Sequence, residues 1–380
     1  MRSFEHGTSA AVSLARERYT GELPSEGAAG PIVAIVGASV PVELVLAAGM
    51  TPVRLSGRPR PAPLADTYDL ARLDGPTTAA FEQLLDPARP FEFALIGGDG
   101  EAHSVLFGAL REIRRVEPHH RLPQLSFVDL LHLPNRTTTR YDRGQVERLV
   151  DTLERWSGRR ITADDVREAV ARVNGIRTLL AEAMALRHRR PARLSGSDAL
   201  HLVGAALVSP PERIRPWLSR LMADSPNLPE LAGPRAYLTG STHEDPAVYE
   251  VIERRGWVIV GEDHPRGQDA LGPAIEQTAD PLDGLVEHYQ FANLPSRRSS
   301  EDRARLVAAG ARAADADIVV HFAFAHDEAT PWDRPAIHEA VAAAGLPDLS
   351  LPEQRFGDVD PDALGAAVES LAFAGVGARR

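Results

Sequence analysis

The chain has 380 residues, a formal net charge of −11 at pH 7 and 25% charged residues, and it contains neither cysteine nor lysine. This composition permits a large hydrophobic core, but it excludes cysteine nucleophiles, cysteine-held metal or iron–sulfur sites and lysine Schiff bases. All 42 basic residues are arginine, and because they form no long run, the sequence predicts no nucleic-acid partner.

The sequence also argues against export and membrane insertion. The first 30 residues carry charged side chains and lack a continuous apolar stretch, which is not the pattern of a signal peptide. The most apolar window, residues 31–50, is interrupted by Ser39, Pro41 and Glu43, so it does not resemble a transmembrane helix. We therefore expect a cytoplasmic protein with no membrane partner.

Strand and helix patterns alternate in the first third of the chain. Apolar, largely β-branched runs predict strands over residues 31–37, 51–55, 91–96 and 122–128. Between them, one helix is predicted to begin at Pro41 and end at Gly49, and another covers residues 102–116. Such alternation is typical of a parallel, doubly wound sheet.

The middle of the chain is helical, and the α/β pattern then returns. Over residues 142–228 the apolar spacing is that of helices, with Thr162 and Ser195 placed as N-caps. Strands are then predicted over residues 235–238, 257–260, 317–324 and 348–351, and helices over 246–255, 301–314 and 335–344. We predict an α/β fold with an N-terminal domain (1–141), a helical region (142–228) and a C-terminal domain (229–380).

Polar or glycine-rich loops follow several predicted strands. Ligands of open α/β sheets bind beyond the carboxyl ends of the strands, and a loop at a helix start can present N–H groups to a phosphate. An ordinary tight turn also explains Gly97-Gly98, because the pattern G-x-G-x-x-G is absent. The predicted substrate-binding residues are Ser39, Glu43, Gly97, Gly98, Thr239, Gly240 and Ser241.

Several segments, in this order and spacing, resemble the 2-hydroxyacyl-CoA dehydratase/benzoyl-CoA reductase subunit family. They are PVELVLAAGM with the following PVRL, then FEFALIGGDGEA, WSGRRITADDVREAVARVNGIRTLLAE, RAYLTGSTHEDPAVYEVIERRGWVIVGEDHPRG and DIVVHFAF. The likeness covers about residues 31–355. It implies two Rossmann-like domains with a helical insertion and a site in the cleft between them.

The resemblance also implies a cofactor that this chain cannot hold in the same way. Family members work as heterodimers of related subunits, bind a CoA thioester and use a cysteine-held [4Fe–4S] cluster for one-electron chemistry. The cluster cysteines would fall near residues 73–77, 98–99 and 324–326, where this sequence has none. We therefore expect no cluster with cysteine ligands in this chain and do not carry over the radical mechanism.

Two hypotheses of different classes follow. The first is a lyase- or dehydratase-like enzyme that performs acid–base chemistry on an acyl or carboxylic small molecule, with an acyl-CoA as one candidate substrate. Its proton-transfer groups would be Asp99, His103, Glu262, Asp263, His321 and His326, although His321 alternates with apolar residues and also fits a buried core histidine. The second is a non-catalytic partner subunit of a cluster-bearing homologue. Either a homodimer or a heterodimer is expected, and a lesser alternative places a metal on Asp99, His326 and Asp327.

Overall fold

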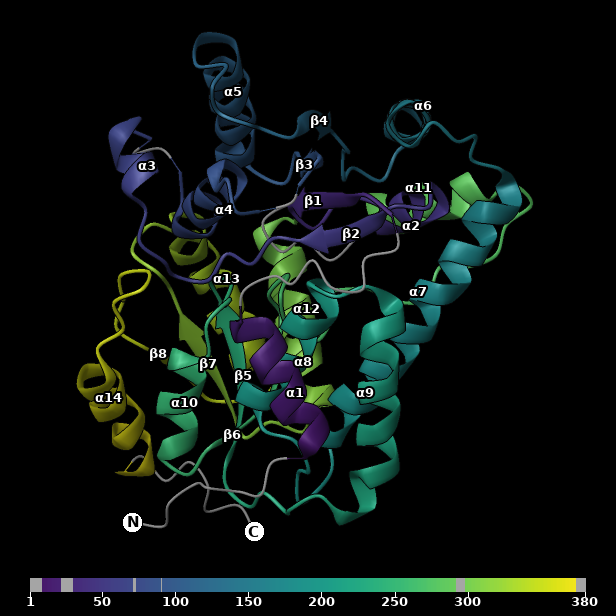
Figure 1. The fold of residues 1–380 in the computed structure, drawn as a ribbon. Helices are drawn as coiled ribbons and strands as arrows, with labels where there is room; N and C mark the ends of the chain where they lie inside the picture. Colours follow the sequence, from purple (N-terminus) through teal and green to yellow (C-terminus); the bar gives the residue numbers. More distant parts are fainter. Residues whose placement is uncertain (1–8, 22–29, 71–72, 90, 292–297, 374–380) are drawn as a thin grey trace.

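The computed structural model describes residues 9–21, 30–70, 73–89, 91–291 and 298–373, and it contains two four-stranded sheets in two lobes (Figure 1). The strand orders are β2-β1-β3-β4 and β6-β5-β7-β8, and every pair of neighbouring strands is parallel. The two sheets thus repeat one topology. This arrangement confirms the predicted α/β class with two doubly wound, Rossmann-like sheets.

The first lobe is a sheet covered by helices on both faces. Alternate residues of its strands face opposite layers: Val33 and Ile35 pack into one core, and Ala34 and Val36 into the other. The strands are β1 (Ile32–Val36), β2 (Thr51–Arg54), β3 (Phe93–Gly97) and β4 (Gln124–Val128). One face is covered by α2 (Val42–Ala47), α6 (Arg136–Ser157), α7 (Ala163–Met184) and α11 (Pro281–Gln290), and the other by α3 (Pro63–Thr67), α4 (Gly75–Leu85) and α5 (Glu101–Val116).

The second lobe has the same layered construction. Its strands are β5 (Arg235–Gly240), β6 (Val258–Glu262), β7 (Ile318–Phe322) and β8 (Asp348–Ser350). One face packs against α8 (Gly196–Leu207), α10 (Ala247–Arg254) and α14 (Pro361–Phe373), and the other against α12 (Ser300–Ala313) and α13 (Ala329–Ala343).

Helices from the middle of the chain connect the two lobes, since α7 packs on the first sheet and α8 on the second. The Thr162 and Ser195 side chains accept from the backbone N–H groups of Asp165 and Asp198, which confirms both predicted N-caps. Helix α7 ends in a 3-10 turn (Ala185–Arg187), and α9 (Pro211–Asp224) ends in another (Ser225–Asn227). An apolar core joins α7, α8 and α9 with α1 (Ala10–Thr20).

Two helices pack away from their sequence neighbours. Helix α1, at the beginning of the chain, lies on α8 and α9, whereas α11 follows the second lobe's first strands but packs with α6 and α7 in the first lobe (Figure 1). The sequence patterns predicted neither helix. The two lobes therefore exchange helices in space.

Several predicted boundaries were wrong for identifiable reasons. Strand β5 continues through Gly240 because it pairs with β7 up to Phe322, so Thr239 and Gly240 end a strand instead of forming its loop. Strand β6 likewise includes Glu262. Helix α6 starts at Arg136, capped by the Asn135 side chain, rather than near residue 142.

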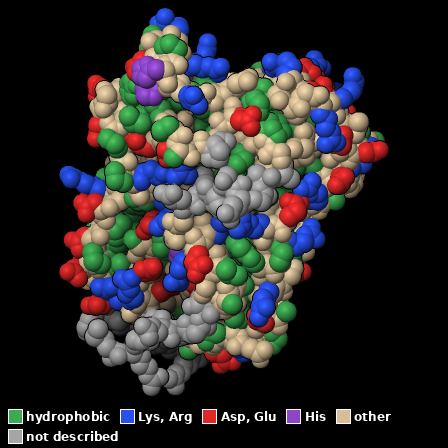
Figure 2. Space-filling view, in the orientation of Figure 1, with side chains coloured by type: hydrophobic (Ala, Val, Ile, Leu, Met, Phe, Trp, Pro, Cys, Tyr) green, Lys and Arg blue, Asp and Glu red, His purple; other side chains and the backbone are tan. Residues whose placement is uncertain are grey.

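The charges on the face drawn in Figure 2 do not mark a binding surface, because arginine and acidic side chains are interspersed over it. None of the described helices has both the length and the apolar character needed to cross a membrane.

Candidate functional site

The carboxyl ends of the two sheets meet at a cavity of about 510 Å³. Such edges are where open α/β sheets bind ligands. Loops after β1, β2, β3, β5, β6 and β7 all contribute to its wall. The polar side chains that line it are Asp74, Thr77, Asp99, Glu101, His103, Ser241, Thr242, Glu244, Arg266, His326, Asp327 and Glu328.

Asp99 links the loops after β3 and β1. Its carboxylate accepts hydrogen bonds from the Ala38 N–H, from the Ser39 N–H over 3.3 Å and from the Ser39 hydroxyl. Burial opposes ionisation, but nearby His103 and these donors outweigh it and lower the pKa of Asp99. Asp99 is therefore held as a carboxylate, and much of its hydrogen-bonding capacity is used to fix the loop.

His103 lies in the first turn of α5, and one of its ring nitrogens is hydrogen-bonded to the backbone. Its Nδ1 lies 2.8 Å from the carbonyl oxygen of Gly97, so Nδ1 carries the proton and donates it. Nε2 is then the acceptor nitrogen of the neutral ring. The side chain is half-buried and lines the cavity. This is the arrangement of a histidine whose tautomer is set for accepting a proton.

The second lobe repeats the serine–aspartate link. The Ser241 hydroxyl donates to Asp327 over 2.7 Å, and Asp327 also accepts from the hydroxyl and N–H of Thr330. Burial opposes ionisation, but these donors lower the pKa of Asp327. In each lobe, a serine after the first strand is thus tied to an aspartate after the third.

Two of the glycines predicted to bind substrate, Gly97 and Gly240, lie where other atoms leave no room for a Cβ. Gly240 has φ +125°, and a Cβ there would lie 1.9 Å from the carbonyl oxygen of Phe322. A Cβ on Gly97 would lie 2.6 Å from Ser39 Oγ. Gly98 allows more room, since its nearest neighbour would be Asp129 Oδ1 at 3.1 Å. A side chain at Gly240 would therefore displace the backbone of β7, and one at Gly97 would displace the Ser39 side chain.

Glu43 lies inside the first lobe rather than on the cavity wall. Its side chain is completely buried, pairs with Arg177 over 2.6 Å and accepts from the Tyr289 hydroxyl over 2.8 Å. Burial opposes ionisation, but Arg177 lowers the pKa of Glu43. The residue joins α2, α7 and α11. Ser39 and Thr239 are also buried.

Three predicted proton-transfer groups, Glu262, Asp263 and His321, form internal contacts away from the cavity. Glu262 Oε1 accepts from Arg187 over 3.0 Å and from the Gln268 N–H over 2.7 Å. Asp263 Oδ2 accepts from Arg303 Nε over 3.2 Å, and burial raises the pKa of this acid. It faces a separate cavity against α12.

His321 lies on the same face of β7 as Val319, which packs against α12 and α13. Its Nε2 is 3.4 Å from Asp348 Oδ2. Burial, opposed by Asp348, lowers the pKa of His321 to about 4, so the ring is neutral near pH 7. The placement is that of a core histidine.

His326 remains at the cavity, across from His103. It is exposed and stacks on Phe324, with ring centroids 5.8 Å apart and an interplanar angle of 12°. The three residues proposed for a metal, Asp99, His326 and Asp327, do not bring their ligand atoms together among the described residues. The structure therefore collects Asp99, His103, His326 and Asp327 around one cavity, but not in a metal-binding geometry.

The sequence patterns did not identify an ion pair of the second lobe that hydrogen-bonds to the first lobe at the cavity. Arg266 pairs with Glu244 over 3.1 Å and donates to the Leu55 carbonyl over 3.2 Å, while Glu244 accepts from the Gly57 N–H over 2.7 Å. These contacts join the second lobe to the loop after β2. Glu244 follows a strand-end loop and could have been a candidate on that ground, but nothing in the sequence pairs it with Arg266.

Comparison with known proteins identifies the family. The family model for 2-hydroxyglutaryl-CoA dehydratase, D-component, matches residues 38–354. The chain belongs to this family. It is similar to a benzoyl-CoA reductase subunit of Thauera aromatica, with 26% identity over 167 residues that cover 43% of each protein. It is also similar to the (R)-phenyllactyl-CoA dehydratase beta subunit of Clostridium sporogenes, with 21% identity over 321 residues, or 81% of this chain and 82% of that one. The resemblance drawn from the sequence segments is confirmed.

The positions expected for cluster cysteines come together at the cavity, but their side chains do not fit a cysteine-held cluster. Asp74 and Asp99 line the cavity, as do Phe324 and His326 on either side of Ala325. Asp74 caps α4 by accepting from the Thr77 N–H over 2.7 Å. Cysteine thiolates are the usual ligands of iron–sulfur clusters, and this dehydratase-family chain offers carboxylates and aromatic rings at these positions instead.

Proposed function

We propose that this family member performs acid–base, lyase-like chemistry on an acyl-CoA or related carboxylic substrate in the interlobe cavity. The observation that carries the proposal is the orientation of His103 at the cavity. Its Nδ1 donates to the Gly97 carbonyl, and its ring forms part of the cavity wall. The nearby Asp99 carboxylate would stabilise the imidazolium formed when Nε2 accepts a proton.

The absence of cysteine restricts the reaction class. A histidine base removes only a proton that the substrate already makes acidic, such as the proton α to a thioester carbonyl. We infer that Nε2 of His103 accepts that proton and that a β-hydroxyl group then leaves as water. The Cα–H and Cβ–O bonds break and a carbon–carbon double bond forms, so no external oxidant or reductant is consumed. His326, from the other lobe, is the candidate donor to the leaving oxygen.

Exchange of α-protons tests this proposal without knowledge of the full substrate. The protein is incubated in D₂O with acetyl-CoA, butyryl-CoA and phenylacetyl-CoA, and deuterium uptake is followed by mass spectrometry. We expect uptake in at least one thioester, slowed about 100-fold or more by His103→Gln. His338→Gln is the matched control, since His338 is exposed and bonds to Asp348 away from the cavity. Equal uptake by wild type and His103→Gln, or none by either, would contradict the proposal.

A second candidate is a non-catalytic partner subunit. The internal contacts of Glu262, Asp263 and His321 favour it, because they remove half of the predicted proton-transfer groups from the cavity. The two relatives named above are themselves subunits by name. Purification of this chain alone, followed by light scattering and the exchange assay, separates the two candidates. A stable assembly that catalyses exchange supports the enzyme, whereas a chain that is stable only with a co-produced homologue supports the partner.

A further inference from the structure

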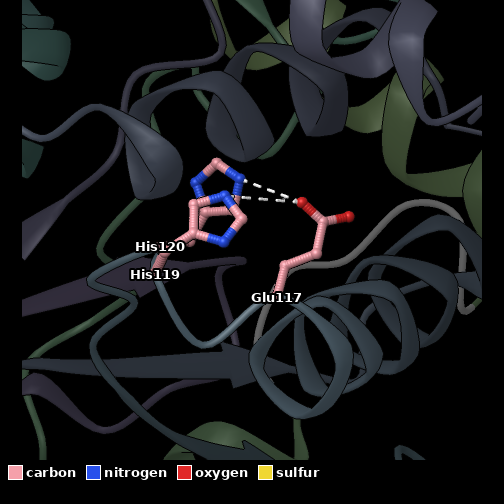
Figure 3. A group of neighbouring side chains, drawn as sticks. All are labelled: Glu117, His119 and His120. Carbon is pink, nitrogen blue, oxygen red and sulfur yellow. Dashed lines mark ion pairs between the residues drawn. The ribbon is translucent and has the colours of Figure 1, made fainter.

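A second cluster of ligand-type side chains lies at the end of α5, away from the cavity. Helix α5 ends at Val116, Glu117 follows as its C-cap, and His119 and His120 lie in the turn that leads to β4. Figure 3 shows both imidazole rings directed toward the Glu117 carboxylate. Among the described residues, this is the one group of three or more such ligands whose atoms lie within 4.8 Å of one another.

The distances suit a shared metal ion. Glu117 Oε2 lies 3.7 Å from His119 Nε2 and 3.3 Å from His120 Nε2. Two ligands about 2.1 Å from a tetrahedral ion lie roughly 3.4 Å apart. The carboxylate–imidazole separations already approximate two edges of such a tetrahedron. Rotations of the exposed His119 and of the half-buried Glu117 and His120 side chains would complete the site.

The Tyr68 hydroxyl borders the cluster, 2.9 Å from Glu117 Oε2 and 3.2 Å from His120 Nε2. The two imidazole rings lie next to each other, with centroids 4.4 Å apart. In the neutral tautomer that carries its proton on Nδ1, each ring presents an Nε2 lone pair, and a divalent ion among the three side chains would accept both lone pairs together with the carboxylate.

The carboxyl end of α5 also favours cation binding at the cluster. The carboxyl end of a helix carries a partial negative charge from its unpaired carbonyl groups, which favours cations. His119 is largely exposed, with 72% of its side chain accessible, so a water molecule can occupy the remaining coordination position. Arg114 and Arg115 in the last turn of α5 oppose cation binding, so we expect a weaker site than a structural zinc centre.

We propose that Glu117, His119 and His120 form a surface site for a divalent transition-metal ion of the zinc class. Two imidazoles and one carboxylate are ligands that such ions accept. The site is separate from the cavity, because His103 lies in the first turn of α5 and Glu117 follows the last, about 20 Å apart at 1.5 Å per residue. It therefore does not depend on the function proposed for the cavity.

Titration of untagged protein with Zn²⁺ in a calorimeter, and with Co²⁺ by visible absorption, tests the site. An untagged chain is needed because a polyhistidine tag would compete. We expect saturation near one equivalent, with affinity lowered at least about 10-fold by His119→Ala and by Glu117→Gln. Tyr68→Phe removes a hydrogen bond but no proposed ligand, so it should retain binding.

His338→Ala is the matched control, since it removes another exposed histidine that contacts an acid. It should leave both titrations unchanged. Circular dichroism of each variant checks that the fold is intact. If wild type shows no saturable binding, or if the His119→Ala and Glu117→Gln variants bind as wild type does, the proposal is overturned.

Discussion

Replacing Glu43 with glutamine should lower stability strongly without acting on the cavity. The side chain is completely buried, its Oε1 is 2.6 Å from Arg177 Nη2, and its Oε2 accepts from the Tyr289 hydroxyl. Glutamine keeps the shape but leaves the Arg177 guanidinium without its counter-charge. Removing one partner of a buried ion pair typically costs about 3–5 kcal/mol.

This cost converts into a measurable change in melting temperature. With an unfolding entropy of roughly 2.1 cal/mol/K per residue, a chain of 380 residues has about 0.8 kcal/mol/K. A loss of about 3–5 kcal/mol then lowers the melting temperature by about 4–6 °C. The pKa of Glu43 is lowered in the folded state. Its stabilisation is therefore present above the ordinary glutamate pKa and is lost as the pH falls through the folded value.

Differential scanning calorimetry at pH 7 measures the effect. Glu250→Gln is the control, because Glu250 forms an exposed helix pair with Arg254 and should change the melting temperature by less than about 1 °C. The double variant Glu43→Leu with Arg177→Met should recover much of the loss, since it removes both charges together. A Glu43→Gln protein that melts within 1 °C of wild type would refute this account of the residue.

Three further substitutions probe other features. Asp99→Asn should cost about 1–3 kcal/mol in urea unfolding, because an amide cannot accept from both Ala38 and Ser39 as the carboxylate does. Since the pKa of Asp99 is lowered, this difference should shrink as the pH falls below about 4. Gly240→Ala should give little soluble protein, because its Cβ would meet the Phe322 carbonyl, whereas Gly108→Ala meets nothing within 4 Å and should express normally. Burial raises the pKa of Glu253 to about 7, so the folded chain keeps a proton that the unfolded chain releases, and stability falls as the pH rises from about 4.5 to 7. Glu253→Gln should flatten that fall in urea unfolding at pH 5 and pH 8.

Local sequence signals predicted the elements with the strongest patterns. Continuous apolar runs identified β1 and β3, and the Thr162 and Ser195 caps identified the starts of α7 and α8, because these signals depend on neighbouring residues alone. Helix α11 was not predicted, although Leu282, Leu285, Val286 and Tyr289 follow the i, i+3, i+4, i+7 spacing of an amphipathic helix. Its start is marked in the sequence by the Asp280 cap followed by Pro281.

The predicted site residues divide into those that line the cavity and those that do not. Asp99 and His103 line it, because parallel strands bring their carboxyl ends to one edge; their roles stay a prediction. The partners of Glu43 lie 134 and 246 residues away in sequence, and those of Glu262 and Asp263 are also distant. Sequence spacing shows which acids are present, but whether an arginine neutralises each one depends on tertiary packing.

The packing of α8 and α11 on lobes that lie on the other side of residue 230 in sequence bears on how the gene can be divided. A break near residue 230 would leave the first fragment without α11, so that Val146 and Leu149 of α6 lose apolar neighbours. It would leave the second fragment without α8, whose Leu200 packs in the core of the second sheet. Neither fragment is a transferable module. Co-expressed fragments are expected to recover the native protein only by assembling with each other, as the complementary pieces of a split reporter do.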